Sequence, residues 1–186
     1  MRESTWQAGG LERPGLVVVA AGPEDAAEVH RLTQAAFAPH ASLDPPSGAV
    51  QETLHQVRAD LRAGMQPGAP AGGAALALLD GRAVGCLRWE ATPGGDLHVR
   101  RVAVEPSLQG RGIGRALMAW AEREAAARGC AGVSLGVRVA LPRNLAFYLR
   151  LGYEVTGEHR HAGYREATWL SMRKSLSPAR RGSTRP

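Results

Sequence analysis

The apolar residues of this chain recur with two different periods, and the changes between them mark the expected secondary structure. Residues 16–21 form a short β-branched run typical of a strand, and residues 22–25 supply the proline and the acidic residues that favour a helix start. The helix that follows carries its apolar residues on one face and ends near Pro39. After Ser47, which can cap a helix, a second amphipathic stripe runs as far as Gly64: Val50, Leu54, Val57 and Leu61.

Three strands are expected between residues 74 and 104. The segments 74–79 and 82–90 flank Asp80-Gly81, a strong signal for a tight hairpin, and a glycine-containing turn then leads into 96–104. In this third strand the apolar residues stand at 97 and 99 and then at 102 and 104, so the two-residue alternation skips one position. Such a skip predicts a β-bulge, which leaves a backbone group unpaired.

The second half of the chain alternates between helices and strands. A glycine-rich turn at residues 106–114 precedes an amphipathic helix that Gly129 ends. Three further elements are expected beyond it: a strand at 133–137, a short helix opened by Pro142 and ended by Gly152, and a strand pair at 153–160 and 166–173 joined by a polar loop.

The composition fits one domain with loose ends. The chain has 186 residues, of which 44% are apolar and 22% charged, and one domain usually spans about 100–200 residues. We expect a folded domain at residues 15–174, a flexible leader at 1–14 and a flexible basic tail at 175–186. Cys86 and Cys130 lack the spacing of a disulfide framework or a zinc site, so no metal is expected. Without a secretory pattern or an apolar run of membrane length, a cytoplasmic location with no membrane partner is expected.

The charge balance favours anionic ligands. Lys and Arg number 23 against 17 Asp and Glu, which gives a formal charge of +6. Such a surface attracts nucleic acid, a phosphorylated cofactor or an acidic partner. Several of the cations lie in the predicted tail, however, and the sequence lacks the exposed aromatic residues, interleaved with basic ones, that single-strand binding uses. Nucleic acid is therefore not expected as a partner.

The glycine-rich turn has the order of strand, loop and helix start that produces an anion site. Free backbone N–H groups and the helix dipole converge there, and Arg111 and Arg115 add positive charge. The phosphate loop of nucleotide hydrolases is excluded because it needs a lysine, and the first lysine is Lys174. A dinucleotide fingerprint is weak because its third glycine would stand at Arg115. A turn that holds no ligand is the remaining alternative.

The turn lies within one sequence motif, and a second motif follows it further along the chain. The first is Arg-Val-Ala-Val-Glu-Pro at 101–106 with Gln-Gly-Arg-Gly-Ile-Gly-Arg-Ala-Leu at 109–117. The second is Asn-Leu-Ala-Phe-Tyr-Leu-Arg-Leu-Gly-Tyr at 144–153. Their order and separation resemble the acetyl-CoA-binding motif and the tyrosine landmark of the GCN5-related N-acetyltransferase (GNAT) family, over about residues 16–174.

The resemblance implies the acyl-CoA N-acyltransferase fold, an α/β architecture. Its central sheet is mixed and mostly antiparallel, with about seven strands, a splayed strand pair and helices on both faces. Acetyl-CoA would place its thioester arm between the splayed strands and its pyrophosphate on the glycine-rich turn. The implied contacts are Val102, Ala103 and Val104 for the arm, and Gln109, Gly110, Arg111, Gly112, Ile113, Gly114 and Arg115 for the pyrophosphate.

One position departs from the family pattern. Members often carry an asparagine seven residues before the tyrosine, where this chain has Leu141. Asn144 stands four residues before Tyr148, on the same face of a helix. Asn144 is therefore the candidate for the side-chain contact to the cofactor arm, with a helix cap as its alternative role.

The reaction implied is acetyl transfer from acetyl-CoA to a primary amine by direct attack. An N–H group freed by the bulge would stabilise the oxyanion, and Tyr148 matches the family's proton donor to the CoA thiolate, with a core tyrosine as the alternative. For the base, Glu90 and Asp96 stand at the ends of neighbouring strands, and we name Glu90 as the candidate. A non-catalytic acyl-CoA-binding or regulatory domain is the competing function.

The acceptor is not specified by the sequence. His159 and His161 lie on one face of a strand without a third metal ligand nearby. With Tyr164 they belong to the loop between the last two strands, which in this family often borders the acceptor site. A small-molecule amine and a peptide amine both stay open as partners, as does a homodimer that uses the sheet edge and Trp169.

Overall fold

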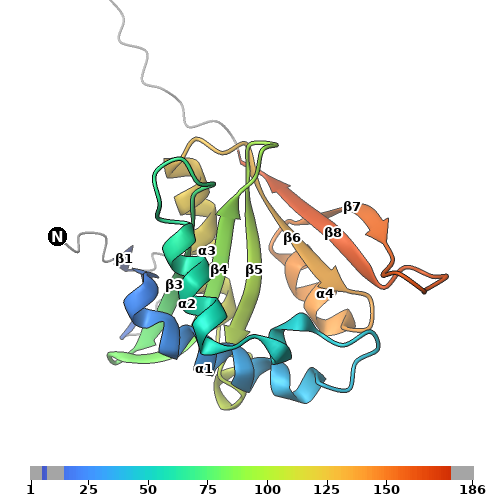
Figure 1. The fold of residues 1–186 in the computed structure, drawn as a ribbon, viewed down its shortest axis with the longest axis horizontal. Coiled ribbons are helices and arrows are strands. Elements are labelled where there is room, and N and C mark those ends of the chain that lie inside the picture. Colours follow the sequence, from blue (N-terminus) through green and yellow to red (C-terminus); the bar gives the residue numbers. More distant parts are fainter. Residues whose placement is uncertain (1–5, 8–14, 177–186) are drawn as a thin grey trace, which may run out of the picture.

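The computed structural model describes residues 6–7 and 15–176, and their strands form one sheet in the order β1-β2-β3-β4-β5-β6-β8-β7 (Figure 1). The strands are β1 (Trp6–Gln7), β2 (Leu16–Ala21), β3 (Gly72–Leu79), β4 (Arg82–Ala91), β5 (Asp96–Val104), β6 (Gly132–Arg138), β7 (Glu154–His159) and β8 (Trp169–Ser175). The helices are α1 (Ala26–Phe37), α2 (Leu54–Ala63), α3 (Ile113–Ala127) and α4 (Pro142–Arg150). Short 3-10 turns are η1 (Pro23–Asp25), η2 (Ala38–His40), η3 (Gly48–Gln51) and η4 (Pro106–Leu108).

The expected fold class is confirmed. Only β5 and β6 run parallel, and every other neighbouring pair in the described sheet is antiparallel. Beyond the seven expected strands, the two-residue β1 pairs with β2 from within the predicted leader. At the other end, Ser175 of β8 still pairs with Gly132 of β6, so β8 reaches one residue into the predicted tail. Leu176 is the last described residue, and its N–H donates to the Ala131 carbonyl at 2.9 Å. The rest of both predicted segments, residues 1–5, 8–14 and 177–186, lies outside the described residues.

The parallel pair separates partway along its length. Pairing between β5 and β6 runs from Asp96↔Gly132 to Val99↔Leu135 and then stops, although β5 continues to Val104. Beyond this point β6 keeps its pairing with β8 on its other side. Figure 1 shows β5 and β6 diverging towards the end of the sheet where α4 begins. The predicted splayed strand pair is therefore present, with one free backbone edge on each of its strands.

The predicted bulge lies on β5 where the strands separate. Arg88 of β4 pairs with Arg100 and Cys86 with Ala103, so two steps on β4 face three steps on β5. Arg101 within the bulge has a φ of 56°, a left-handed conformation that is uncommon for a residue with a side chain. The extra residue keeps Val102 and Val104 against the same core as Leu97 and Val99, while Ala103 packs into the opposite core.

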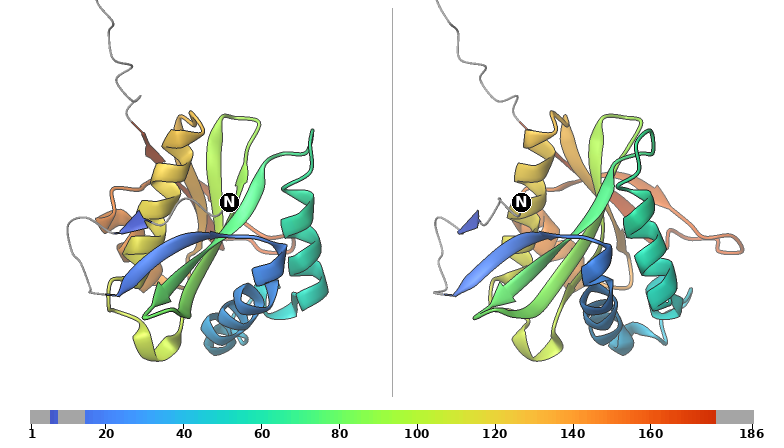
Figure 2. Two further views of the ribbon diagram at one scale, coloured as in Figure 1. Left: turned by 90° about the vertical axis from the view of Figure 1, so that its left-hand side faces the viewer. Right: turned by 60° about the vertical axis from the view of Figure 1, so that its left-hand side comes forward.

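Helices cover both faces of the sheet (Figure 2). One face packs against α3 and α4 around a core that includes Leu117, Tyr148 and Tyr153. The other face packs against α1 and α2 around a second core that includes Leu32 and Cys86. Within the described part of the chain, no helix is long and apolar enough to cross a membrane.

The single helix expected between Ser47 and Gly64 is wrong in its first half. Ser47 caps only the 3-10 turn η3, and α2 starts at Leu54 with Thr53 as its own cap in a reciprocal pair with Gln56. Between the two, Glu52 has an extended backbone with ψ of 132°. Its carboxylate binds two arginines of the sheet, a tertiary contact that the amphipathic pattern does not reveal.

Candidate active site

The start of α3 presents a row of free backbone donors. Gly110 and Gly112 have φ values of 73° and 84°, which only glycine adopts readily. The first helical bond runs from the Ala116 N–H to the Gly112 carbonyl at 3.0 Å, and the N–H groups of residues 110–115 find no acceptor among the described residues. A helix start with unpaired N–H groups binds anions through these donors and the helix dipole.

A cavity of ≈ 690 Å³ extends from these donors to α4. The site residues expected from the sequence that line it are Val102, Val104, Gln109, Gly110, Gly112, Ile113, Gly114, Arg115, Asn144 and Tyr148. Arg143 and Arg150 of α4 line it too and add positive charge that sequence reasoning did not assign. A Cβ on Gly114 would lie 3.3 Å from the Phe147 ring, so this glycine permits the close approach of α4. The tertiary structure therefore brings both sequence motifs to one cavity.

Three expected site residues lie elsewhere. The Ala103 side chain is 1% exposed and packs on the α1 face, so only its backbone belongs to the separated edge of β5. Arg111 is exposed and does not line the cavity. The Glu90 side chain, 49% exposed, lies beside α2, where it faces Arg100 at 4.0 Å and lines a separate small cavity. The structure therefore does not bring Glu90 and Tyr148 together.

Tyr148 occupies the point at which the strands separate. Its side chain is 9% exposed and packs edge-on against Phe147 and Tyr153, with ring centroids 5.0 and 6.0 Å away. No described residue hydrogen-bonds to its hydroxyl. Burial raises the pKa of the phenol above its usual value of 10.0, so the hydroxyl keeps its proton at neutral pH. It is thus a protonated donor that has no acceptor among residues 6–7 and 15–176.

A second cavity of ≈ 330 Å³ adjoins the first, because Val102, Asn144 and Tyr148 line both. Its other walls come from the segment before η3, from β5 and β6, and from the β7–β8 region. The polar and aromatic residues of these walls are Ser47, His98, Arg100, Arg101, Arg138, His161 and Trp169. Together the two cavities reach Tyr148 from both sides of the separated strands.

His98 was missed by sequence reasoning. It lines the second cavity, and its Nδ1 lies 3.1 Å from the Ser134 hydroxyl oxygen on β6. Burial lowers the pKa of its imidazole below 6.5, so the ring is neutral and able to accept a proton at pH 7. In the sequence His98 is an ordinary alternating strand position, and only the separation of β5 from β6 places it in a cavity wall.

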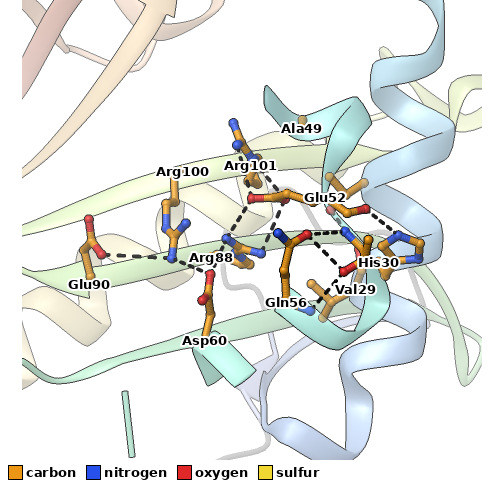
Figure 3. A network of polar contacts seen from close by, with 12 residues as sticks. Val29, His30, Ala49, Glu52, Gln56, Asp60, Arg88, Glu90, Arg100 and Arg101 are labelled. Carbon is orange, nitrogen blue, oxygen red and sulfur yellow. Dashed lines mark hydrogen bonds and ion pairs between the residues drawn. The ribbon is translucent and has the colours of Figure 1, made fainter. Parts of the chain in front are cut away.

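A network of ion pairs fixes the wall behind this cavity (Figure 3). The Arg88 side chain is 2% exposed, and its guanidinium donates to Glu52 and to Asp60, each at 3.2 Å. The Glu52 carboxylate also accepts from Arg101 of the bulge at 3.2 Å, and Asp60 accepts from Arg100 at 3.5 Å. Because burial disfavours an unpaired guanidinium, these carboxylates hold Arg88 in place. They also tie the segment between η3 and α2 to β4 and to the bulge.

The loop after β7 and the start of β8 form a further wall of the second cavity. The His159 ring stacks on Trp169 with centroids 4.0 Å apart, and His161 hydrogen-bonds to Thr168. The Tyr164 hydroxyl donates to Asp44, which connects this loop to the segment before η3. Both histidines therefore have protein partners near the second cavity, and His161 lines it.

An open mixed sheet that separates beside an anion-binding helix start defines a class of acyl-group transferases, and comparison with known proteins gives the family. The sequence profile of the acetyltransferase (GNAT) family matches residues 36–153. The chain therefore belongs to the GNAT acetyltransferase family. Acetyl-CoA is the acetyl donor of this family, which confirms the co-substrate expected from the sequence. No curated protein matches the sequence significantly.

Solved structures share the fold at low sequence identity. The ribosomal-protein-S18-alanine N-acetyltransferase from Escherichia coli has a TM-score of 0.67 and 17% identity, over 90% of this chain and 97% of its own. An acetyltransferase from Thermus thermophilus has a TM-score of 0.65 and 24% identity, over 87% of this chain and 97% of its own. The PaiA N-acetyltransferase from Thermoplasma acidophilum, solved with coenzyme A, has a TM-score of 0.69 and 16% identity, over 87% of this chain and 99% of its own. These likenesses establish the fold.

Proposed function

We propose that the protein transfers the acetyl group of acetyl-CoA to a primary amine by direct attack. The observation that carries the proposal is one continuous arrangement: free N–H groups at the start of α3, the separated edge of β5 and the unpartnered Tyr148 hydroxyl line one cavity. A thioester bound there would lie with its acyl end where the second cavity begins. The amine would enter from that second cavity.

The described residues fit the donor along its length. The N–H groups of residues 110–115 would hold the pyrophosphate, and Arg115, Arg143 and Arg150 would add charge. The free edge of β5 at residues 102–104 would bind the amide groups of the thioester arm as an additional strand does. Asn144 lines both cavities and would contact the arm near its acyl end.

The chemistry needs two proton transfers. The neutral amine attacks the thioester carbonyl carbon, a C–N bond forms, and the C–S bond breaks as the tetrahedral intermediate collapses. The amine loses one proton, which we assign to neutral His98 or a water bound to it, in place of Glu90. A His98 that donates Nδ1–H to Ser134 keeps its Nε2 lone pair free for this proton. Tyr148 gives a proton to the departing thiolate, so that the products are the amide and CoA-SH.

Replacing Gly112 with valine tests the anion site. We expect acetyl-CoA affinity, measured by calorimetry, to fall at least ~10-fold, because a β-branched residue strains the left-handed backbone that aims the N–H groups at the ligand. The matched control is Gly129→Val, which imposes a similar strain (φ of 73°) at the opposite end of α3. Equal affinity losses in the two variants would show that α3 stability, and not the anion site, is responsible.

Replacing His98 with glutamine tests the assignment of the base. With the free fraction of the amine substrate taken into account, we expect kcat/KM of the parent to fall at low pH with an apparent pKa below 6.5. In the variant this fall of kcat/KM at low pH should disappear, and kcat/KM at pH 7 should be about 100-fold lower than in the parent. His55→Gln, a change on the exposed side of α2, is the control. An unchanged pH profile in His98→Gln would remove His98 from the mechanism.

A further inference from the structure

The second cavity has walls of one charge sign. The arginines and histidines that line it are His98, Arg100, Arg101, Arg138 and His161, and no aspartate or glutamate among the described residues does so. An acceptor that binds there brings its amine to Tyr148 and the acyl end of the donor, so the rest of the acceptor lies against these groups. Their charge therefore bears directly on which amines the enzyme accepts.

Two of the three arginines are already neutralised by carboxylates behind the wall. Arg101 donates to Glu52 through Nε at 3.3 Å and Nη2 at 3.2 Å. Arg100 faces Asp60 at 3.5 Å and Glu90 at 4.0 Å. These pairs make Arg100 and Arg101 part of the structural network in Figure 3 rather than free anion ligands.

Arg138 is different. No carboxylate of the described residues lies within 4.0 Å of its guanidinium, and its Nη2 donates to the Pro45 carbonyl at 2.6 Å. Its Nε is buried and has no hydrogen-bond partner in the part of the chain that the structure describes. A buried donor on an uncompensated charge is unfavourable by itself, whereas a carboxylate ligand satisfies both the donor and the charge. The Arg138 side chain thus has a donor and a charge that a bound carboxylate would satisfy.

The neighbouring residues leave space beside Arg138. Along β6 it follows Ser134 and Gly136 on the same face, and Ser134 is the residue that contacts His98. Gly136 presents no side chain, and a Cβ there would meet the Trp169 ring at 3.5 Å. Trp169 pairs with Arg138 across β6 and β8 and lines the same cavity. An acceptor would therefore lie between the His98 end and the Arg138 end, against an aromatic wall.

We propose that the acceptor is a small molecule that carries a primary amine and a carboxylate, an amino acid in the broad chemical sense, and that Arg138 binds the carboxylate. The assignment rests on the proposed acetyl transfer and specifies its substrate class. A guanidinium binds a carboxylate with two parallel N–H donors, which also orients the amine. Polycationic amines such as polyamines and aminoglycosides are disfavoured, because Arg138 repels a second cationic group and no aspartate or glutamate among the described residues lines the cavity to bind one.

The experiment compares each common L-amino acid with its α-carboxamide as acceptor, with spermidine and kanamycin as polycationic amines. For the best pair, the ratio of kcat/KM for the acid to that for the amide is measured in the parent and in Arg138→Gln. The acid and its amide differ in the intrinsic reactivity of the amine, but this difference is the same for both proteins. It therefore cancels when the acid-to-amide ratio of the variant is compared with that of the parent. We expect it to fall about 10- to 100-fold in Arg138→Gln, as for the loss of a charged hydrogen bond, and Arg138→Lys to retain part of it. Arg62→Gln removes an exposed cation of α2 and serves as the control.

The outcomes separate the two proposals. Acetyl-CoA binding with acetylation of the carboxamides or polycations in preference to the acids overturns the Arg138 assignment and leaves acetyl transfer intact. An acid-to-amide ratio that Arg138→Gln leaves unchanged does the same. If no acid is acetylated, calorimetric titration of the acids into the CoA-bound protein decides, and absence of binding overturns the assignment. A parent that does not bind acetyl-CoA overturns the proposed function itself.

Discussion

Replacing Tyr148 with phenylalanine is expected to lower kcat by about 100-fold or more and to leave acetyl-CoA affinity nearly unchanged. The ring, which packs against Phe147 and Tyr153, is retained, and only the unpartnered hydroxyl is lost. Without this proton donor the CoA thiolate must leave as an anion in a largely buried site, which raises the barrier to collapse of the intermediate. Steady-state kinetics and calorimetry measure the two quantities separately.

Tyr153→Phe is the matched control for that change. Tyr153 also packs in the core, but its hydroxyl faces Glu122 at 3.3 Å and lines neither cavity. We expect this variant to keep kcat. Equal kcat in Tyr148→Phe and the parent would exclude Tyr148 as the donor, and acetyl-CoA binding without acetylation of any amine would favour the non-catalytic alternative.

The pH dependence of kcat gives a second view of Tyr148. Its pKa is raised by burial above 10.0, so the donor form persists across the physiological range. The parent should therefore show no decline in kcat that belongs to loss of this proton until the pH exceeds about 10, the usual value for tyrosine. A decline between pH 7 and 9 that is absent in Tyr148→Phe would contradict the raised pKa.

Replacing Glu52 with alanine is expected to lower the free energy of unfolding by about 3 kcal/mol. Arg88, 2% exposed, would keep only Asp60 as a partner, and Arg101 of the bulge would lose its carboxylate altogether. For a chain of this length the corresponding fall in Tm is about 6–12 °C. Thermal and denaturant unfolding, monitored by circular dichroism, give both quantities.

The matched comparison is Arg88→Met, which removes the buried guanidinium, whereas Glu52→Ala removes the carboxylate that pairs with it. Glu52 then still pairs with Arg101, and Asp60 with Arg100, so no charge is left buried and unpaired. We expect this variant to lose about 1 kcal/mol or less, since the large cost of breaking a buried ion pair comes from the charge left unpaired, and both carboxylates keep an arginine partner here. A larger loss in Arg88→Met than in Glu52→Ala would contradict the proposed order of effects.

Parts of the fold and of the site could be predicted from the sequence, because the residue patterns that indicate them are local. The hairpin at Asp80-Gly81 needs two residues with positive φ, and they have φ values of 51° and 80°. The skipped alternation on β5 is the bulge, because an extra residue shifts every later side chain by one position. The glycines of the turn likewise report backbone conformation directly.

Other parts could not be predicted, because they depend on contacts between distant segments. The amphipathic stripe after Ser47 predicts one helix, but the ion pairs of Glu52 with Arg88 and Arg101 break it. The strand-end position of Glu90 predicts a base, but the structure places Glu90 beside α2 and places His98 in the cavity wall. No local pattern distinguishes these two residues.

The sequence by itself determined most of the elements, the bulge, the glycine-rich helix start and the family, since each is encoded in the spacing of neighbouring residues. Only the tertiary structure decided where β5 and β6 separate, and with it which side chains face the two cavities. The physical reason is that pairing partners and buried counter-charges come from segments far apart in the chain. The free edge at residues 102–104, the neutral His98 and the uncompensated Arg138 exist only after those segments have packed.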